Sequence, residues 1–284
     1  MTQYLVKATE VAAHLGDPSW CIFDCRHDLR QTEYGPQSYA RGHIPGAQHL
    51  HLDRDLSAPT TGRNGRHPLP DPQILAGKLS QCGVGINTQV VAYDNEGGIF
   101  ASRLWWLLRW MGHRHTAVLD GGMAGWKRAG LLLEGGTPLV TAEQFILRLD
   151  GASNMEVDTD FVMRHLESED MTMVDARSPA RFMGENETLD PVGGHIPGAT
   201  NRFYADNLDD DGCYFKPVEQ LRKEFVSLLG GRDPRHVVQS CGSGVTACHN
   251  LLAMELAGLS GSKLYAGSWS EWCSDPGRPM ATGA

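Results

Sequence analysis

The chain has 284 residues, a length at which one hydrophobic core usually divides into two domains. Its formal net charge of −9 argues against a protein that binds duplex nucleic acid, because such binding requires a basic face. The N-terminus has no basic segment followed by an apolar core, and no apolar run approaches the ~20 residues of a membrane span. We therefore expect no nucleic-acid or membrane partner and a cytoplasmic location.

The seven cysteines include no Cys-x-x-Cys pair. A disulfide framework favours an even number of cysteines in a shorter, secreted chain, and a structural zinc site needs close-spaced ligand pairs. We therefore expect neither, and most of the cysteines should be small buried apolar residues. No nucleotide-binding fingerprint or metal cluster stands in the sequence, so we expect no cofactor.

Short apolar runs alternate with helical patterns along both halves of the chain. The runs that we expect to form strands cover residues 21–24, 89–93, 172–175 and 236–240. Apolar residues recur at three- and four-residue spacing over 72–82 and 217–229, which predicts helices there, and a further helix is expected over 247–257. This alternation predicts an α/β fold in which helices flank a mainly parallel sheet.

The two halves repeat four short landmarks in the same order, which indicates a duplicated domain. The paired landmarks are Asp24-Cys25-Arg26 with Asp175-Ala176-Arg177, Arg41-Gly42-His43 with Gly193-Gly194-His195, Val90-Val91 with Val237-Val238, and Asp120-Gly121-Gly122 with Ala266-Gly267-Ser268. The repeat predicts an N-terminal domain over 1–132 and a C-terminal domain over 158–284. The stretch 133–157 contains several glycines and lacks a long apolar periodicity, so we interpret it as a linker.

His-Ile-Pro-Gly-Ala occurs in both halves, beginning at His43 and at His195. Proline fixes φ and glycine permits a left-handed backbone, so the motif predicts a turn. Because both halves keep it although they differ in their cysteine, we interpret both histidines as structural. The halves do differ after the third landmark, where the first carries Asp94 and the second carries Cys241. This asymmetry indicates one working site, in the second half.

The segment from Cys241 to Ala247 joins an expected strand to an expected helix. In parallel sheets ligands bind beyond the carboxyl ends of the strands, which is where Cys241 stands. Two glycines let the loop curl so that its backbone N–H groups point to a common centre, and the helix adds its positive end. A thiol there should be largely thiolate near neutral pH, the form that attacks sulfur, carbon or phosphorus. The loop residues that we expect to bind substrate are Gly242, Gly244, Val245, Thr246 and Ala247.

Protein tyrosine phosphatases also place a cysteine in such a loop. They close it with an arginine six residues after the cysteine, which clamps the phosphoryl oxygens. Here that position is Ala247, so phosphatase chemistry lacks its main electrostatic group.

At these residues the chain resembles the tandem rhodanese family of sulfurtransferases, over nearly its whole length. The residues that carry the resemblance are Asp175-Ala176-Arg177, His195-Ile196-Pro197-Gly198-Ala199, the loop from Cys241 to Ala247, and the stretch from Leu264 to Trp272. The resemblance implies two tandem rhodanese-like domains, the first non-catalytic and the second catalytic. It also implies that Cys241 takes a sulfur atom as a persulfide and passes it to a thiol or cyanide.

The loop sequence bears on the sulfur donor. Members that use thiosulfate resemble Cys-Arg-Lys-Gly-Val-Thr, whereas members that use 3-mercaptopyruvate resemble Cys-Gly-Ser-Gly-Val-Thr, which stands here. A loop without cations suits the single carboxylate of mercaptopyruvate better than the doubly charged thiosulfate. We therefore expect 3-mercaptopyruvate as donor, with thiosulfate as the alternative. A non-catalytic interaction module is a third reading, against which the intact cysteine loop argues.

The resemblance also implies roles for residues outside the loop. A set of Ser243, His67 and Asp55 would handle a proton at the departing pyruvate, with Asp53 as the rival of Asp55. Arg181 would hold the substrate carboxylate as a bidentate partner.

A second family arginine, some nine residues on, has no counterpart, because Asp190 stands about there. We expect that Arg202 or another group replaces it, or that the substrate preference differs from that of the members that use mercaptopyruvate. Cyanide, thioredoxin and glutathione are the acceptors that stay open, and we expect a monomer.

Overall fold

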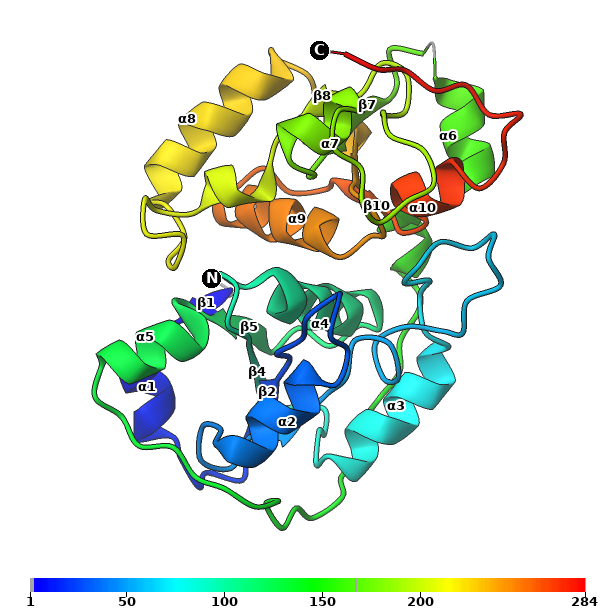
Figure 1. Cartoon of the computed structure of the whole chain (residues 1–284). Helices are drawn as coiled ribbons and strands as arrows, with labels where there is room; N and C mark the ends of the chain where they lie inside the picture. The colour runs from blue at the N-terminus through cyan, green and yellow to red at the C-terminus, as the bar shows by residue number, and fades with distance from the viewer. Residues whose placement is uncertain (1–2, 167, 284) are drawn as a thin grey trace. The chain divides into compact units, whose positions relative to one another are not determined.

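The computed structural model describes residues 3–166 and 168–283 and divides the chain into two units (Figure 1). Unit 1 consists of the residues up to Ala58 together with Leu69–Ala152 and Leu208–Phe215. Unit 2 consists of Pro59–Pro68, Ser153–Asn207 and the chain from Lys216 onward. Each unit thus contains one short segment from the sequence range of the other repeat.

Unit 1 contains a five-stranded sheet in which every pair of neighbouring strands is parallel. In spatial order the strands are β1 (Leu5–Val6), β5 (Thr116–Leu119), β4 (Gln89–Tyr93), β2 (Trp20–Asp24) and β3 (Gln48–His49). The helices are α1 (Ala8–Ala13), α2 (Tyr34–Arg41), α3 (Pro72–Gln81), α4 (Ile99–Trp110) and α5 (Gly122–Arg128). Figure 1 shows these helices on both sides of the sheet.

Unit 2 repeats this topology strand for strand. Its parallel sheet has the order β6 (Glu156–Val157), β10 (Lys263–Tyr265), β9 (Val237–Ser240), β7 (Thr172–Asp175) and β8 (Thr200–Asn201). Its helices are α6 (Thr159–His165), α7 (Pro179–Met183), α8 (Val218–Leu229), α9 (Thr246–Leu256) and α10 (Ser268–Trp272). Short 3-10 turns lie at Ala152–Asn154, Tyr204–Asn207 and Pro234–His236. The predicted α/β fold of two repeats with flanked parallel sheets is confirmed.

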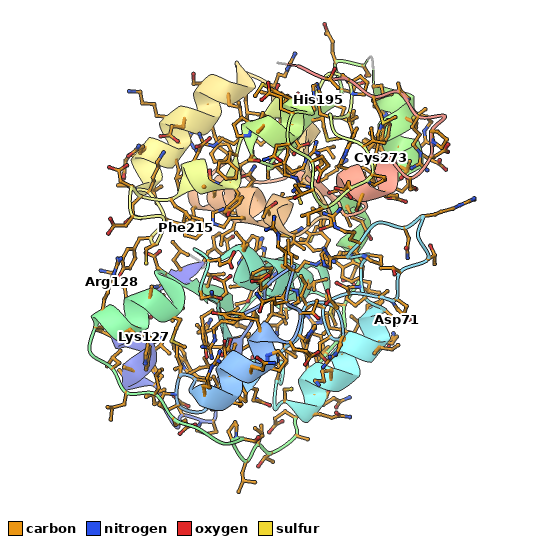
Figure 2. The ribbon with its side chains drawn as sticks, in the orientation of Figure 1. Asp71, Lys127, Arg128, His195, Phe215 and Cys273 are labelled. Carbon is orange, nitrogen blue, oxygen red and sulfur yellow. The ribbon has the colours of Figure 1, made fainter. Side chains whose placement is uncertain are left out.

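The predicted elements agree with the structure to within about a residue at their ends, as is usual for such boundaries. The strand expected over 236–240 begins at Val237, because His236 belongs to a 3-10 turn. The helix expected over 72–82 is α3, whose N-terminus is capped by Asp71. Asp71 lies at the N-terminal end of α3 (Figure 2). Its side chain accepts hydrogen bonds from the backbone N–H groups of Gln73 and Ile74, as expected of an N-cap.

The structure differs from a linear division into 1–132, 133–157 and 158–284. Residues 156–157 form β6, the edge strand of unit 2, so a strand lies inside the expected linker. This strand has only two half-buried residues, too few to produce an apolar period. The segments 59–68 and 208–215 are grouped with the unit of the other repeat.

The shared landmarks stabilise both units in the same way. Arg26 forms a fork with Asp24 and donates to Gly42 O, and Arg177 does the same with Asp175 and Gly194 O. His195 stacks on Phe182 with ring centroids 3.8 Å apart, and its Nδ1 lies 2.9 Å from Phe182 O.

The corresponding histidine of unit 1 is bonded in the same manner. His43 stacks on Tyr39 with centroids 3.9 Å apart, and its Nδ1 lies 2.8 Å from Tyr39 O. The geometry is that of two matched structural turns. Among the described residues no helix combines the length and the apolar character that a membrane crossing requires.

Candidate active site

Cys241 lies one residue beyond β9, at the carboxyl edge of the sheet of unit 2. It is buried, and its Sγ accepts a hydrogen bond from the backbone N–H of Ser243 at 3.4 Å. The loop is fastened to the first turn of α10, because Trp269 N donates to Cys241 O and Ser270 N donates to Gly242 O, both at 2.9 Å. The sulfur is therefore placed by two turns and not by the cysteine loop alone.

Ser268 is a site residue that the sequence did not point out. Its hydroxyl accepts a hydrogen bond from Cys241 N at 3.0 Å and donates one to Tyr265 O at 2.8 Å. Its φ is +52°, the only positive φ of a non-glycine residue in the described ranges. Such a backbone costs energy for a residue with a Cβ and often occurs at functional sites. The available signal was the repeat itself, in which Gly122 stands at the same position.

His67 and Ser243 meet as expected. His67 Nδ1 lies 2.7 Å from Ser243 Oγ, and both side chains are buried. Although His67 comes from the N-terminal half of the sequence, it lies in the segment that belongs to unit 2. That segment is fixed to α10 through Arg66 N, which donates to Ser270 Oγ at 3.0 Å.

The two candidate aspartates lie in unit 1. Asp55 accepts a hydrogen bond from His51 N at 2.8 Å and pairs with Lys78 at 3.2 Å. Asp53 lies 3.9 Å from His27 and 4.0 Å from His51. The pairing of either aspartate with His67 stays a prediction.

Arg181, the expected carboxylate-binding residue, already holds two carboxylates. Its Nε and Nη2 donate to Glu187 at 3.0 and 2.9 Å, and Nη2 also donates to Asp190 at 3.2 Å. Glu187 was missed by the sequence analysis, because nothing in its local pattern distinguishes it from a surface residue. Burial opposes ionisation of Glu187, but hydrogen bonds from Leu189 N and Arg181 outweigh it and lower its pKa.

Arg66 brings a second guanidinium to the cysteine loop. It forms an ion pair with Asp190, whose side chain is 2 % exposed. Its Nη2 lies 2.7 Å from the place that a Cβ of residue 242 would occupy, and Nη2 of Arg181 lies 3.3 Å from the same point. Gly242 therefore leaves room for two arginines that converge on the loop.

Arg202, the named candidate for the missing second arginine, is engaged elsewhere. It donates to Glu224 at 2.6 Å and to Asn207 at 3.0 Å, and its guanidinium lies over the ring of Phe225. The replacement of the second arginine, by Arg202 or by another group, therefore stays a prediction, and of the two arginines Arg66 is the one that lies beside the cysteine loop. The exchange of segment 59–68 into unit 2, which local sequence patterns do not reveal, brings Arg66 there.

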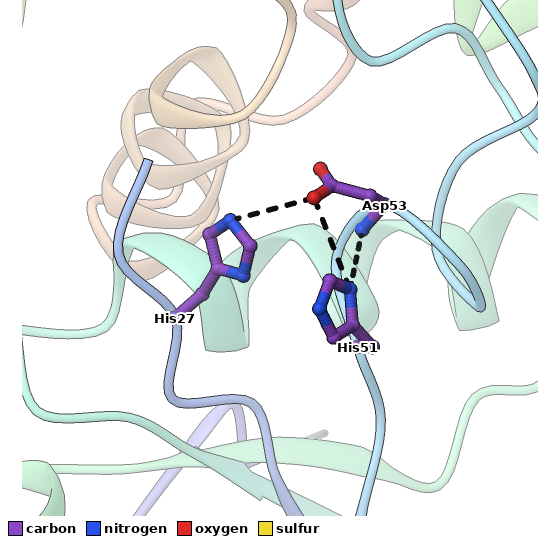
Figure 3. Close-up of side chains that lie close together, drawn as sticks. All are labelled: His27, His51 and Asp53. Atoms are coloured by element: carbon purple, nitrogen blue, oxygen red, sulfur yellow. Dashed lines mark hydrogen bonds and ion pairs between the residues drawn. The ribbon is translucent and has the colours of Figure 1, made fainter. Parts of the chain in front are cut away.

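A candidate metal cluster lies in unit 1, formed by His27, His51 and Asp53 (Figure 3). One ligand atom from each lies within 4.8 Å of the others. His51 Nε2 contacts Thr32 O at 3.0 Å, and His51 Nδ1 already accepts a hydrogen bond from Asp53 N at 3.1 Å. Because this bond uses the lone pair that a metal would need, we interpret the cluster as a hydrogen-bonded structural group.

The seven cysteines are buried free thiols, and several are chemically quiet. Burial raises the pKa of Cys21 to about 12, and that of Cys273 to about 11. Burial also raises the pKa of Cys25 well above its usual value, and the negative charges of Asp24 and Asp94 add to this. These thiols are poor nucleophiles at neutral pH.

Comparison with known proteins agrees with the repeat and the site. The family model of the rhodanese-like domain matches twice, at residues 7–129 and 158–275. A Pseudomonas aeruginosa protein named probable 3-mercaptopyruvate sulfurtransferase is 48% identical over 281 residues, covering 98% of both chains. Mouse thiosulfate sulfurtransferase is 31% identical over 95% of this chain and 90% of its own.

A solved structure matches this chain over the length of both repeats. The crystal structure of SseA from Escherichia coli, described as a 3-mercaptopyruvate sulfotransferase, matches with a TM-score of 0.81 and 32% identity. The match covers 94% of this chain and 99% of that one. The chain belongs to the family of proteins built from rhodanese-like domains.

Proposed function

We propose that this protein is a sulfurtransferase that moves a sulfur atom from 3-mercaptopyruvate, through a persulfide on Cys241, to a thiol or cyanide. The observation that carries the proposal is the placement of the Cys241 sulfur beside the Ser243–His67 pair within one unit. Relatives whose names state sulfurtransferase activity support it.

In the first step the Cys241 thiolate attacks the sulfur of mercaptopyruvate. The new S–S bond forms as the C–S bond breaks, and the electron pair of the C–S bond leaves on carbon as the enolate of pyruvate. A proton delivered to that carbon completes pyruvate, and the persulfide stays on Cys241. An acceptor nucleophile then attacks the outer sulfur, the S–S bond breaks, and the Cys241 thiolate returns.

Ser243 and His67 are placed to handle the proton. Their 2.7 Å contact lets the imidazole and the hydroxyl exchange a proton, and Ser243 N also touches the reacting sulfur. Asp55, with Asp53 as its rival, completes the set in this proposal by orienting His67. The loss of the Ser243 hydroxyl should therefore slow donor cleavage more than acceptor attack.

The donor is held by groups on both sides of the sulfur. Arg181 receives the carboxylate, while backbone groups of the loop from Gly242 and Gly244 through Val245, Thr246 and Ala247 surround the transferred sulfur. For Arg181 to serve, the donor carboxylate must share it with Glu187 and Asp190, which hold it in this structure.

Thiosulfate is the second candidate donor. The relative named thiosulfate sulfurtransferase supports it. The acceptors proposed are thioredoxin, glutathione or cyanide. A monomeric state and a cytoplasmic location stay predictions.

The proposal is tested by steady-state sulfur transfer to cyanide, with mercaptopyruvate and thiosulfate side by side. We expect kcat/KM to favour mercaptopyruvate by about tenfold or more, and a larger loss with mercaptopyruvate than with thiosulfate in Ser243→Ala. If thiosulfate is preferred, the donor assignment is wrong. If neither donor is used, the proposed function is wrong.

A further inference from the structure

The proposed donor site contains a balanced set of charges that the sequence did not reveal. Arg66 and Arg181 contribute two positive charges, and Glu187 and Asp190 contribute two negative ones. Asp190 forms ion pairs with both arginines, and its side chain is 2 % exposed. Two ion pairs offset the cost of burying a carboxylate. The four groups therefore add no net charge beside the cysteine loop.

The position of Arg66 is unusual for a residue so far from the loop in sequence. Arg66 and Asp190 are 124 residues apart, and the contact exists because segment 59–68 belongs to unit 2. Arg66 uses Nη1 for Asp190, and its Nη2 faces the point from which a side chain of residue 242 would project. The guanidinium therefore fills the space that a longer side chain at 242 would need.

We propose that Arg66 is the second guanidinium that receives the carboxylate of the donor, and that Asp190 is the residue that selects a singly charged donor. This inference rests on the proposed function and deepens it. Arg66 and Arg181 both approach Gly242, so a carboxylate near the loop can contact both. Asp190 neutralises one of the two cations, so a doubly charged donor gains less from the site than it would from two unpaired arginines.

The roles of the two residues predict opposite effects of their removal. Arg66→Gln takes away a donor of charge-assisted hydrogen bonds, so kcat/KM for mercaptopyruvate should fall about tenfold, mainly through KM. Asp190→Asn keeps the shape and leaves the site with a net positive charge. The ratio of kcat/KM for thiosulfate to that for mercaptopyruvate should then rise about fivefold or more. In the double variant the gain with thiosulfate should disappear while the loss with mercaptopyruvate persists.

The experiment measures kcat/KM for both donors, with cyanide as acceptor, in the full-length protein and each variant. Arg63→Gln is the matched control, because Arg63 is an exposed arginine of the same segment, and it should stay within about twofold of the wild type. Thermal unfolding identifies a variant that misfolds. Arg66→Lys then replaces Arg66→Gln, because lysine keeps the charge and loses the planar fork, and it should give an intermediate loss.

A second measurement separates donor binding from a general defect. The persulfide is formed first in excess donor, the donor is removed, and the discharge by cyanide is followed in a single turnover. Arg66→Gln should leave this step unchanged, because the carboxylate has departed with pyruvate. The inference is overturned if Arg66→Gln behaves like Arg63→Gln, or if Asp190→Asn changes both donors equally. If the wild type uses neither donor, the proposed function has failed instead.

Discussion

The loop after β4 and the loop after β9 stand at the same place in two copies of one fold, but they surround different side chains. In unit 1 the carboxylate of Asp94 accepts hydrogen bonds from four backbone N–H groups of its own loop and of α4, at 2.8–3.0 Å. In unit 2 the sulfur of Cys241 accepts one from Ser243 N. The first loop therefore closes on its own side chain, whereas the second can receive an anion carried by the cysteine.

The turns that hold these loops differ in a related way. Met123 N donates to Asp94 O in unit 1, as Trp269 N donates to Cys241 O in unit 2. The preceding residue is Gly122, with φ +50°, in unit 1 and Ser268, with φ +52°, in unit 2. A Cβ at Gly122 would lie 2.5 Å from Asp94 O, so only unit 2 has room for a side chain there. The serine keeps the strained backbone and adds a hydroxyl that binds the nucleophile's N–H.

The largest expected effect separates the two loops chemically. Cys241→Ser should lower sulfur transfer about a thousandfold or more, because the hydroxyl does not form a persulfide. The matched control is Cys25→Ala in unit 1, because the corresponding residue of unit 2 is already an alanine, Ala176. The control should keep nearly full activity in the cyanide assay. Substantial turnover by Cys241→Ser would move the reaction to another thiol.

The next effect concerns the stability of unit 1. Asp94→Ala leaves four N–H groups, three of them buried, without their acceptor, so the free energy of unfolding should fall by about 3 kcal/mol. Asp94→Asn keeps one oxygen and should cost less. Urea denaturation followed by fluorescence measures both. Equal stability of all three proteins would mean that the carboxylate does not hold the loop.

A smaller effect distinguishes the hydroxyl of Ser268 from its backbone. Both Ser268→Ala and Ser268→Gly remove the acceptor of Cys241 N, so each should lower kcat about tenfold. Only glycine relieves the positive φ, and the glycine variant should be more stable than the alanine variant by about 1 kcal/mol. Steady-state turnover measures the loss of kcat in the two variants, and thermal unfolding measures the difference in their stability. Full activity in either variant would remove the positioning role.

The smallest expected effect is a pH dependence in unit 1. Desolvation, with the negative charges of Asp94 and Asp28, raises the pKa of Glu96 to about 7. A raised pKa means that the protonated form favours the folded state, so the contribution of Glu96 is present below its usual pKa and is lost as pH rises through 7. Glu96→Gln should therefore stabilise the protein more at pH 8 than at pH 5, by about 1 kcal/mol after solvent screening. A constant difference between these pH values would contradict the shift.

The repeated landmarks predicted the paired sheets and the Cys241 loop because they are local patterns. The contact of His67 with Ser243 was expected from the family resemblance, and the structure contains it. Arg66 could not be found in this way, because its partner Asp190 is 124 residues distant and no local period marks the pair. Glu187 and Ser268 were missed for a similar reason, since their roles depend on which turn lies beside the loop.

Because segment 59–68 belongs to unit 2, the two repeats cannot be expressed as separate fragments without splitting that unit. A fragment that encodes only the second repeat would contain the nucleophile but would lack both His67 and Arg66. The first repeat therefore cannot be discarded as a silent duplicate, because it supplies ten residues of unit 2, among them His67 and Arg66. The two repeats are therefore expected to function only when they are parts of one chain.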